Sequence, residues 1–286
     1  MSSMRNVILP TDFSPNAQKA IAYAQNLFKG NTTTFYLVNV MDGAVPYSTT
    51  GIGTKRMAET INKSLLEQSN EGLETTMADL KAQGIAEEHT FVPCSLKGSF
   101  FNTIEKFIEE KDIHYVIMGT KGASGLKEMT LGSNTSSLLG KVLAAVLAVP
   151  ENYTFQNIDE LVFATDYEVD YSEKGLAPLL DLRRDHNARI AVLFLDEQRK
   201  GLSGTQITAK SYLQTLLKEE NSDYFELDGV GVAMGARLFT KSRRADLLCL
   251  VAKKHDKLLD LFRKSETKGM VNHADVPILV LNQANF

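Results

Sequence analysis

The fold is decided by a short motif that occurs twice, NVILPTDFS at Asn6–Ser14 and LVFATDYEV at Leu161–Val169. Each copy is an apolar run that ends in Thr-Asp followed by an aromatic residue. The runs contain β-branched residues and are nearly continuous rather than alternating, as expected for strands buried on both faces of a parallel sheet. The motif therefore predicts a duplicated domain that begins with a buried strand.

The similarity between the two copies continues along the chain, which changes how every later motif is interpreted. After each motif come a helical pattern and further apolar runs in the same order. Between the last two pairs of runs the copies align without a gap, at a constant offset of 132 residues. The corresponding pairs are Thr34–Asp42 with Arg189–Glu197, His114–Gly119 with Asp246–Val251, and Ala145–Pro150 with Pro277–Asn282.

The alternation of strands and helices predicts the fold class. Each apolar run is separated from the next by ten or more residues of helical character, as in 15–29, 98–110 and 171–187. This order implies right-handed crossovers and a doubly wound sheet. We therefore predict an α/β protein of two tandem five-stranded parallel-sheet sandwiches, residues 1–152 and 153–286. The border lies in the polar stretch ENYTFQN, residues 151–157.

Composition excludes several classes of protein. The chain has 286 residues, 43% of them hydrophobic and 23% charged, which is ordinary for a globular protein with two domains. Its formal charge of −4 and the lack of a lysine-rich run argue against a nucleic-acid partner. The longest apolar run, Val142–Val149, is far shorter than the ~20 residues of a membrane span. We expect a cytoplasmic protein that neither crosses a membrane nor binds nucleic acid.

No constellation of catalytic or metal-ligating residues is visible in the sequence. Cys94 and Cys249 are the only cysteines, which fits neither a disulfide framework nor a zinc site. The five histidines show no pair at metal-ligand spacing, and no serine lies in a nucleophile-elbow sequence. We therefore predict no catalytic and no metal-ligating residues.

A glycine segment, MGTKGASGLKEMTLGSN at Met118–Asn134, lies between an expected strand, His114–Met118, and an expected helix, Asn134–Lys141. Ligands of open α/β sheets bind at the carboxyl ends of the strands, and a helix amino terminus favours anions. Glycines there let backbone amides approach phosphate oxygens, and nearby hydroxyl groups add donors. The segment predicts a polyphosphate site, and the alternative is a flexible loop whose glycines only permit turns.

The spacing Gly119-x-x-Gly122, nine residues, then Gly132-Ser133 resembles the nucleotide-binding signature of the universal stress protein family. VILPTDFS near the start is similar to the first strand and aspartate of that family. The resemblance covers the whole chain as a tandem pair, with the full motif only in the first copy. It implies an ATP-binding, Rossmann-like domain of the adenine nucleotide alpha hydrolase-like class, usually paired with another copy.

The resemblance also assigns site residues. It places Asp12 beside the nucleoside, whereas the residues alone allow Asp12 to be a helix cap. The backbone of Val40 is expected to meet adenine. The residues expected around the ribose and phosphates are Met118, Gly119, Gly122, Gly132, Ser133 and Asn134, with Thr135 in the first turn of the following helix. Ser133 and Thr135 are expected to offer hydroxyl donors.

The second copy lacks the glycines. Val251, Lys254 and Lys264 stand opposite Gly119, Gly122 and Gly132, so we predict that the second copy binds no ATP. Asp166 remains opposite Asp12, which also suits a shared structural role. The replacement segment is basic, and it is interpreted as a solvated surface or as a site for another anion.

A helical insertion, residues 54–83, distinguishes the first copy. It carries an apolar stripe that is typical of a helix lying on a sheet, with a partner-binding helix as the alternative. The stripe consists of Met57, Ile61, Leu65, Leu73, Met77 and Leu80.

The predicted function is that of a binding module. The resemblance implies an ATP-binding regulator of the stress response, with Mg²⁺ on the phosphates. The implied partners are the adenine nucleotide, an unknown regulatory protein and a further homodimer. Pairing of Val146–Val149 with Ile278–Leu281 would join the two copies as an internal pseudo-dimer. The alternatives are a slow ATPase or adenylate-transferring enzyme on the same fold, and a nucleotide-free scaffold.

Overall fold

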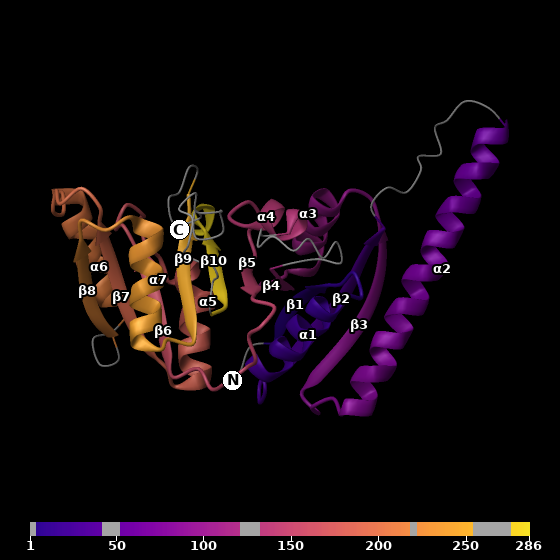
Figure 1. Cartoon of the computed structure of the whole chain (residues 1–286), viewed down its shortest axis with the longest axis horizontal. Coiled ribbons are helices and arrows are strands. Elements are labelled where there is room, and N and C mark those ends of the chain that lie inside the picture. The colour runs from indigo at the N-terminus through magenta and orange to yellow at the C-terminus, as the bar shows by residue number, and fades with distance from the viewer. Residues whose placement is uncertain (1–3, 42–51, 121–131, 218–221, 254–275) are drawn as a thin grey trace. The chain divides into compact units, whose positions relative to one another are not determined.

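The computed structural model of the chain describes residues 4–41, 52–120, 132–217, 222–253 and 276–286. The chain divides into two compact units, Met1–Met118 and Gly119–Phe286. Strands and helices alternate along both units (Figure 1). The order of the elements is the one that the apolar runs predict.

The first unit is a parallel sheet with helices between its strands. Its elements are β1 (Arg5–Pro10), α1 (Pro15–Leu27), β2 (Thr33–Met41), α2 (Ile52–Gln83), β3 (His89–Lys97), α3 (Phe100–Lys111) and β4 (Tyr115–Gly119). The strand order is β3-β2-β1-β4. β1 is therefore internal, with Val7 opposite Phe35 of β2 and opposite Tyr115 of β4. α1 begins at Pro15, because the Ser14 hydroxyl accepts a hydrogen bond from the Ala17 N–H at 3.2 Å.

The second unit contains the same succession of elements. They are α4 (Ser133–Leu138), β5 (Ala145–Val149), β6 (Glu160–Thr165), α5 (Glu173–His186), β7 (Arg189–Asp196), α6 (Gly204–Leu217), β8 (Ser222–Asp228), α7 (Val232–Arg243), β9 (Leu247–Ala252) and β10 (Ile278–Asn282). The strand order is β5-β10-β9-β6-β7-β8. All these pairs are parallel except β5 with β10.

The continuous apolar runs become the most buried strands. All residues of β4, β5, β9 and β10 are buried. Strands covered on both faces need apolar side chains at every position, which explains why these runs do not alternate. The predicted fold class, an α/β protein with mostly parallel sheets, is confirmed.

The pairing predicted between the last strands of the two copies is also confirmed. β5 and β10 are antiparallel, with Ala148 opposite Ile278 and Val146 opposite Val280. This pairing draws β5 into the second compact unit, so the border between the units precedes the polar stretch 151–157. The division of the sequence repeat at 152 and 153 stays a prediction.

Helix α2 is not an insertion as predicted, because α6 is its shorter counterpart in the second repeat. α2 lies on the sheet and contacts β2 and β3, beside which it is drawn in Figure 1. Leu73 and Leu80 are buried as predicted, but Met57 is 67% exposed, so its predicted place on the buried face is wrong. The buried face continues through small and polar side chains, which the apolar pattern does not reveal. These are Ala58, Asn62, Ser69 and Thr76.

Replacing Glu88 by glutamine is expected to destabilise the protein at neutral pH only. The Glu88 carboxylate accepts a hydrogen bond from the Gly30 N–H at 2.6 Å. The backbone N–H groups of Glu88 itself and of Gly30 lower the pKa of this carboxyl. Because its pKa is lower in the folded state, the ionised carboxylate stabilises the fold at pH values above the unfolded-state pKa. This contribution is lost as the pH falls through the folded-state pKa.

Urea unfolding of the wild type and Glu88→Gln at neutral pH and near pH 3 measures this contribution. The two midpoints should differ at neutral pH and converge in acid. A difference of the same size at both pH values would contradict the role given to the Gly30 N–H.

Candidate functional site

Asp12 lies in a turn that follows β1, and we call residues 11–14 the Asp12 turn. The Asp12 carboxylate accepts a hydrogen bond from the Ser14 N–H at 3.1 Å, and the Thr11 hydroxyl accepts one from the Phe13 N–H at 3.0 Å. Phe13 has a φ of 64°, in the left-handed region. The cap of α1 is Ser14, so Asp12 is not the helix cap that the residues alone allowed. Asp12 itself is exposed to solvent.

Two further predicted residues lie on the strands that flank β1. Val40 is a half-buried residue near the end of β2, and Met118 is a buried residue near the end of β4. Between β1 and β2, the Asn39 side-chain amide donates a hydrogen bond to the Thr11 carbonyl at 2.8 Å. Since β1 is paired with both β2 and β4, the Asp12 turn, Val40 and Met118 belong to one edge of this sheet, formed by carboxyl strand ends. Such an edge is where open α/β sheets bind ligands.

The two ends of the glycine segment are joined to each other. The Gly132 N–H donates to the Thr120 carbonyl at 2.7 Å, and the Thr120 N–H donates to the Val149 carbonyl at 3.0 Å. Both ends of segment 121–131 therefore lie at the carboxyl end of β4. Gly122 lies outside the described residues.

The helix after the segment presents two of the three predicted side chains to solvent. α4 begins at Ser133, one residue before the predicted start, and Ser133 and Asn134 are exposed. Thr135 is buried, and its hydroxyl donates to the Gly119 carbonyl at 2.8 Å. The hydroxyl proton of Thr135 is thus already used. The expected hydrogen bond from Thr135 to a phosphate is replaced by an anchor of α4 to β4.

The second repeat builds the same turn and then adds a cation to it. The Glu168 N–H donates to the Asp166 carboxylate at 3.0 Å, and the Tyr167 N–H donates to the Thr165 hydroxyl at 3.1 Å, as in the Asp12 turn. The Lys253 ammonium, however, lies 2.5 Å from the Asp166 carboxylate, and its side chain is only 15% exposed. Lys254 and Lys264 lie outside the described residues.

Three residues around these turns were missed by the sequence analysis. Thr11 could have been found from the sequence, because threonine precedes aspartate in both copies. Asn39 carries no such signal, since its role depends on the neighbouring strand. Lys253 belongs to the basic replacement segment, but its pairing with Asp166, 87 residues away, was not predicted.

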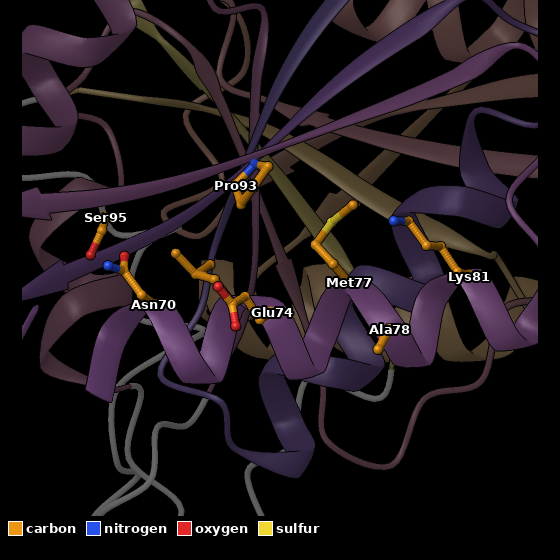
Figure 2. Close-up of a pocket in the computed structure, with 8 residues that line it drawn as sticks. Asn70, Glu74, Met77, Ala78, Lys81, Pro93 and Ser95 are labelled. Carbon is orange, nitrogen blue, oxygen red and sulfur yellow. The ribbon is translucent and has the colours of Figure 1, made fainter. Parts of the chain in front are cut away.

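A separate groove of about 440 Å³ lies between α2 and β3. Figure 2 shows Asn70, Glu74, Met77 and Lys81 of α2 with Pro93 and Ser95 of β3. Among the described residues, none of those predicted to bind the nucleotide lines it. The groove is therefore a feature of α2 and β3 that is distinct from the Asp12 turn.

The part of the chain that the structure describes was also searched for metal-ligating and nucleophilic side chains. It contains no group of three His, Cys, Asp or Glu side chains placed to hold a metal ion. Burial raises the pKa of the Cys249 thiol and of the half-buried Cys94 thiol, so neither is activated as a nucleophile. No described helix combines the length and the apolarity that a membrane crossing requires.

The profile of the universal stress protein family matches residues 4–150, which include the Asp12 turn, β4 and α4. The chain belongs to the universal stress protein family. Residues 4–150 are the family domain, and the second repeat follows it.

Two universal stress proteins of Methanocaldococcus jannaschii are similar to this chain. One is 29% identical over 150 residues, which are 51% of this chain and 81% of that protein. The other is 28% identical over 152 residues, or 51% of this chain and 94% of that protein. The crystal structure of a universal stress protein from Archaeoglobus fulgidus is similar over both repeats. It has a TM-score of 0.71 and 15% identity, covering 97% of this chain and 98% of that one, so the universal stress protein fold extends through the second repeat.

Proposed function

We propose that this universal stress protein binds ATP through its first repeat, with the adenosine at the Asp12 turn and the phosphates at the glycine segment. The observation that carries the proposal is the hydrogen bond that joins the residues on either side of segment 121–131. The Gly132–Thr120 hydrogen bond brings both ends of the segment to the carboxyl end of β4. Backbone amides in a glycine-rich segment and the exposed Ser133 hydroxyl are groups that suit phosphate oxygens.

The second repeat supports the restriction to one nucleotide per chain. Its aspartate, Asp166, already binds the Lys253 ammonium, and side chains replace the three glycines. Among the described residues no acidic cluster surrounds the predicted site, so Mg²⁺ would be held by the phosphates rather than by a protein cage. Bound Mg²⁺ would offset phosphate charge.

The regulatory part of the proposal follows from family membership. The protein would act in the stress response in the cytoplasm, as a binding module whose nucleotide state is recognised by a regulatory protein. The β5–β10 pairing supports a pseudo-dimer of the two repeats within one chain. A further homodimer would use other surfaces.

Isothermal titration of Mg²⁺-ATP tests the proposal, with Asp12→Ala and Asp166→Ala as a matched pair. Each variant loses the same turn hydrogen bond to the residue two positions on. Only Asp12→Ala is expected to weaken ATP binding, by about tenfold or more, because hydrogen bonds to charged groups contribute roughly 1.5–3 kcal/mol. The wild type should bind one ATP per chain.

Three results would contradict this function. Equal losses of affinity in the two variants would mean that Asp12 acts only in the turn. No heat and no thermal stabilisation with wild-type protein would favour the nucleotide-free scaffold. Formation of ADP or AMP that Asp12→Ala abolishes would favour the enzyme.

A further inference from the structure

The middle of α2 contains a glycine that lies directly against the Asp12 turn. Gly72 is the only glycine between Thr54 and Gln83, and glycine is a poor helix former. A Cβ atom on Gly72 would stand 2.5 Å from the ring of Phe13, closer than real carbon contacts allow. The ring thus occupies the space of a side chain at position 72. This contact gives the helix a packing reason for its glycine.

Phe13 and Asp12 belong to one hydrogen-bonded turn. The left-handed backbone at Phe13 is a conformation that non-glycine residues adopt only when their surroundings favour it. The bonds from Phe13 to Thr11 and from Ser14 to Asp12 fix the residues on both sides of the ring. We expect a displaced ring to strain this turn and so to shift the Asp12 carboxylate.

α2 is also linked to β3 through Ser69, one helical turn before Gly72. The Ser95 hydroxyl of β3 donates a hydrogen bond to the Ser69 hydroxyl, which is buried. Ser95 pairs with Asn39 in the sheet, and Asn39 holds the Thr11 carbonyl. Positions three apart share a helix face, so Ser69 and Gly72 lie on the same face of α2.

The second repeat shows that the turn does not require a helix glycine. Tyr167 has the same left-handed backbone, with a φ of 56°. Its ring is instead stacked on Phe194 of β7, at a centroid distance of 5.3 Å, and is 2% exposed. The contact between the aromatic ring of the turn and a helix glycine is therefore found in the repeat that carries the complete glycine motif.

We propose that Gly72 and Ser69 are positioning residues of the nucleotide site, which couple α2 to nucleotide occupancy through the Asp12 turn. This inference rests on the proposed function. Coupling is reciprocal: if α2 positions Asp12 for ATP, then bound ATP restricts the motion of α2. α2 is thereby the element in which a partner protein would detect the bound nucleotide.

Gly72→Ala tests the coupling, because it favours the helix locally while it pushes the Phe13 ring away. It is expected to weaken Mg²⁺-ATP binding by about tenfold, about 1.4 kcal/mol at 25 °C, without loss of helix content. The matched control is Thr75→Ala, an exposed position of α2 that also gains helix propensity. Thr75→Ala should bind ATP like the wild type.

The pair Phe13→Leu and Phe13→Leu/Gly72→Ala separates positioning from general damage to the helix. Leucine leaves room for a Cβ atom at position 72, so Gly72→Ala should cost no further affinity in that background. A double-mutant cycle with no coupling between positions 13 and 72 would overturn the inference. Unchanged ATP affinity in Gly72→Ala would overturn it as well.

Hydrogen exchange keeps the inference distinct from the proposed function. In protein without nucleotide, the amides of Phe13 and Ser14 should exchange faster in Gly72→Ala than in the wild type and in Thr75→Ala. If these amides respond but the wild type binds no ATP, the proposed function fails while the positioning contact stands. If ATP binds but neither these amides nor the ATP affinity responds to Gly72→Ala, the positioning role fails alone.

In wild-type protein ATP should slow exchange around residues 69–76, and unchanged exchange there would overturn the coupling.

Discussion

Replacing Gly140 by alanine is expected to lower the free energy of unfolding by about 3 kcal/mol. Gly140 follows α4 and has a φ of 66°, where an L-residue is strained by about 1–2 kcal/mol. A Cβ atom there would stand 2.3 Å from the Cβ atom of Ala252 in β9, and overpacking of this kind typically costs about 1–3 kcal/mol. Urea unfolding followed by circular dichroism measures the loss.

Gly201→Ala is the matched control, because it separates strain from overlap. Gly201 has a φ of 69°, but no atom lies within 4 Å of the position of its added Cβ atom. This variant should therefore lose only the strain contribution, about 1 kcal/mol. The double variant Gly140→Ala/Ala252→Gly should be more stable than the sum of its single changes predicts. Equal losses in Gly140→Ala and Gly201→Ala would contradict the close approach to Ala252.

Leu279→Ala is expected to destabilise the protein by about 3 kcal/mol, within the usual range for a buried leucine. Leu279 is 0% exposed in the centre of β10, between Leu147 of β5 and Cys249 of β9. Truncation removes apolar contacts with the neighbours on both strands and leaves a cavity. The measured quantity is the free energy of unfolding in urea.

The exposed Leu238 of α7 provides the control for that experiment. Its side chain is 54% exposed, so Leu238→Ala should change the stability by less than about 0.5 kcal/mol. If Leu279→Ala were equally mild, β10 would not be an internal strand. The pairing between the last strands of the two repeats would then be wrong.

Most of the fold could be predicted because strands buried on both faces have continuous runs of apolar residues. Val146–Val149 and Leu247–Val251 are continuous apolar runs, and both are buried strands in the structure. The duplicated Thr-Asp-aromatic motif located the first strand of each repeat, but it did not predict the turn that follows. α2 was harder, because Asn62, Ser69 and Thr76 occupy its buried face and are not apolar. Its predicted stripe was therefore out of phase at Met57.

The sequence motif names the residues of the candidate site, which stay a prediction, but it does not reveal all their contacts in the structure. Asp12 and Gly132 follow from the motif, and the structure places them at strand and helix ends. The bond between Thr135 and Gly119 could not be predicted, since a hydroxyl next to a glycine loop suits a phosphate and a carbonyl equally well. Likewise, no local pattern relates Phe13 to Gly72, because the contact depends on where α2 crosses the turn.

The hydrogen bond between Gly132 and Thr120 joins the two residues that flank segment 121–131. The entropy of closing such a segment grows only slowly with its length. Its chemistry and its size can therefore be exchanged in evolution or by engineering without shifting the strands below. Duplicated domains of this kind can diverge in the ligand that they bind through sequence changes in this one segment, while the fold stays the same.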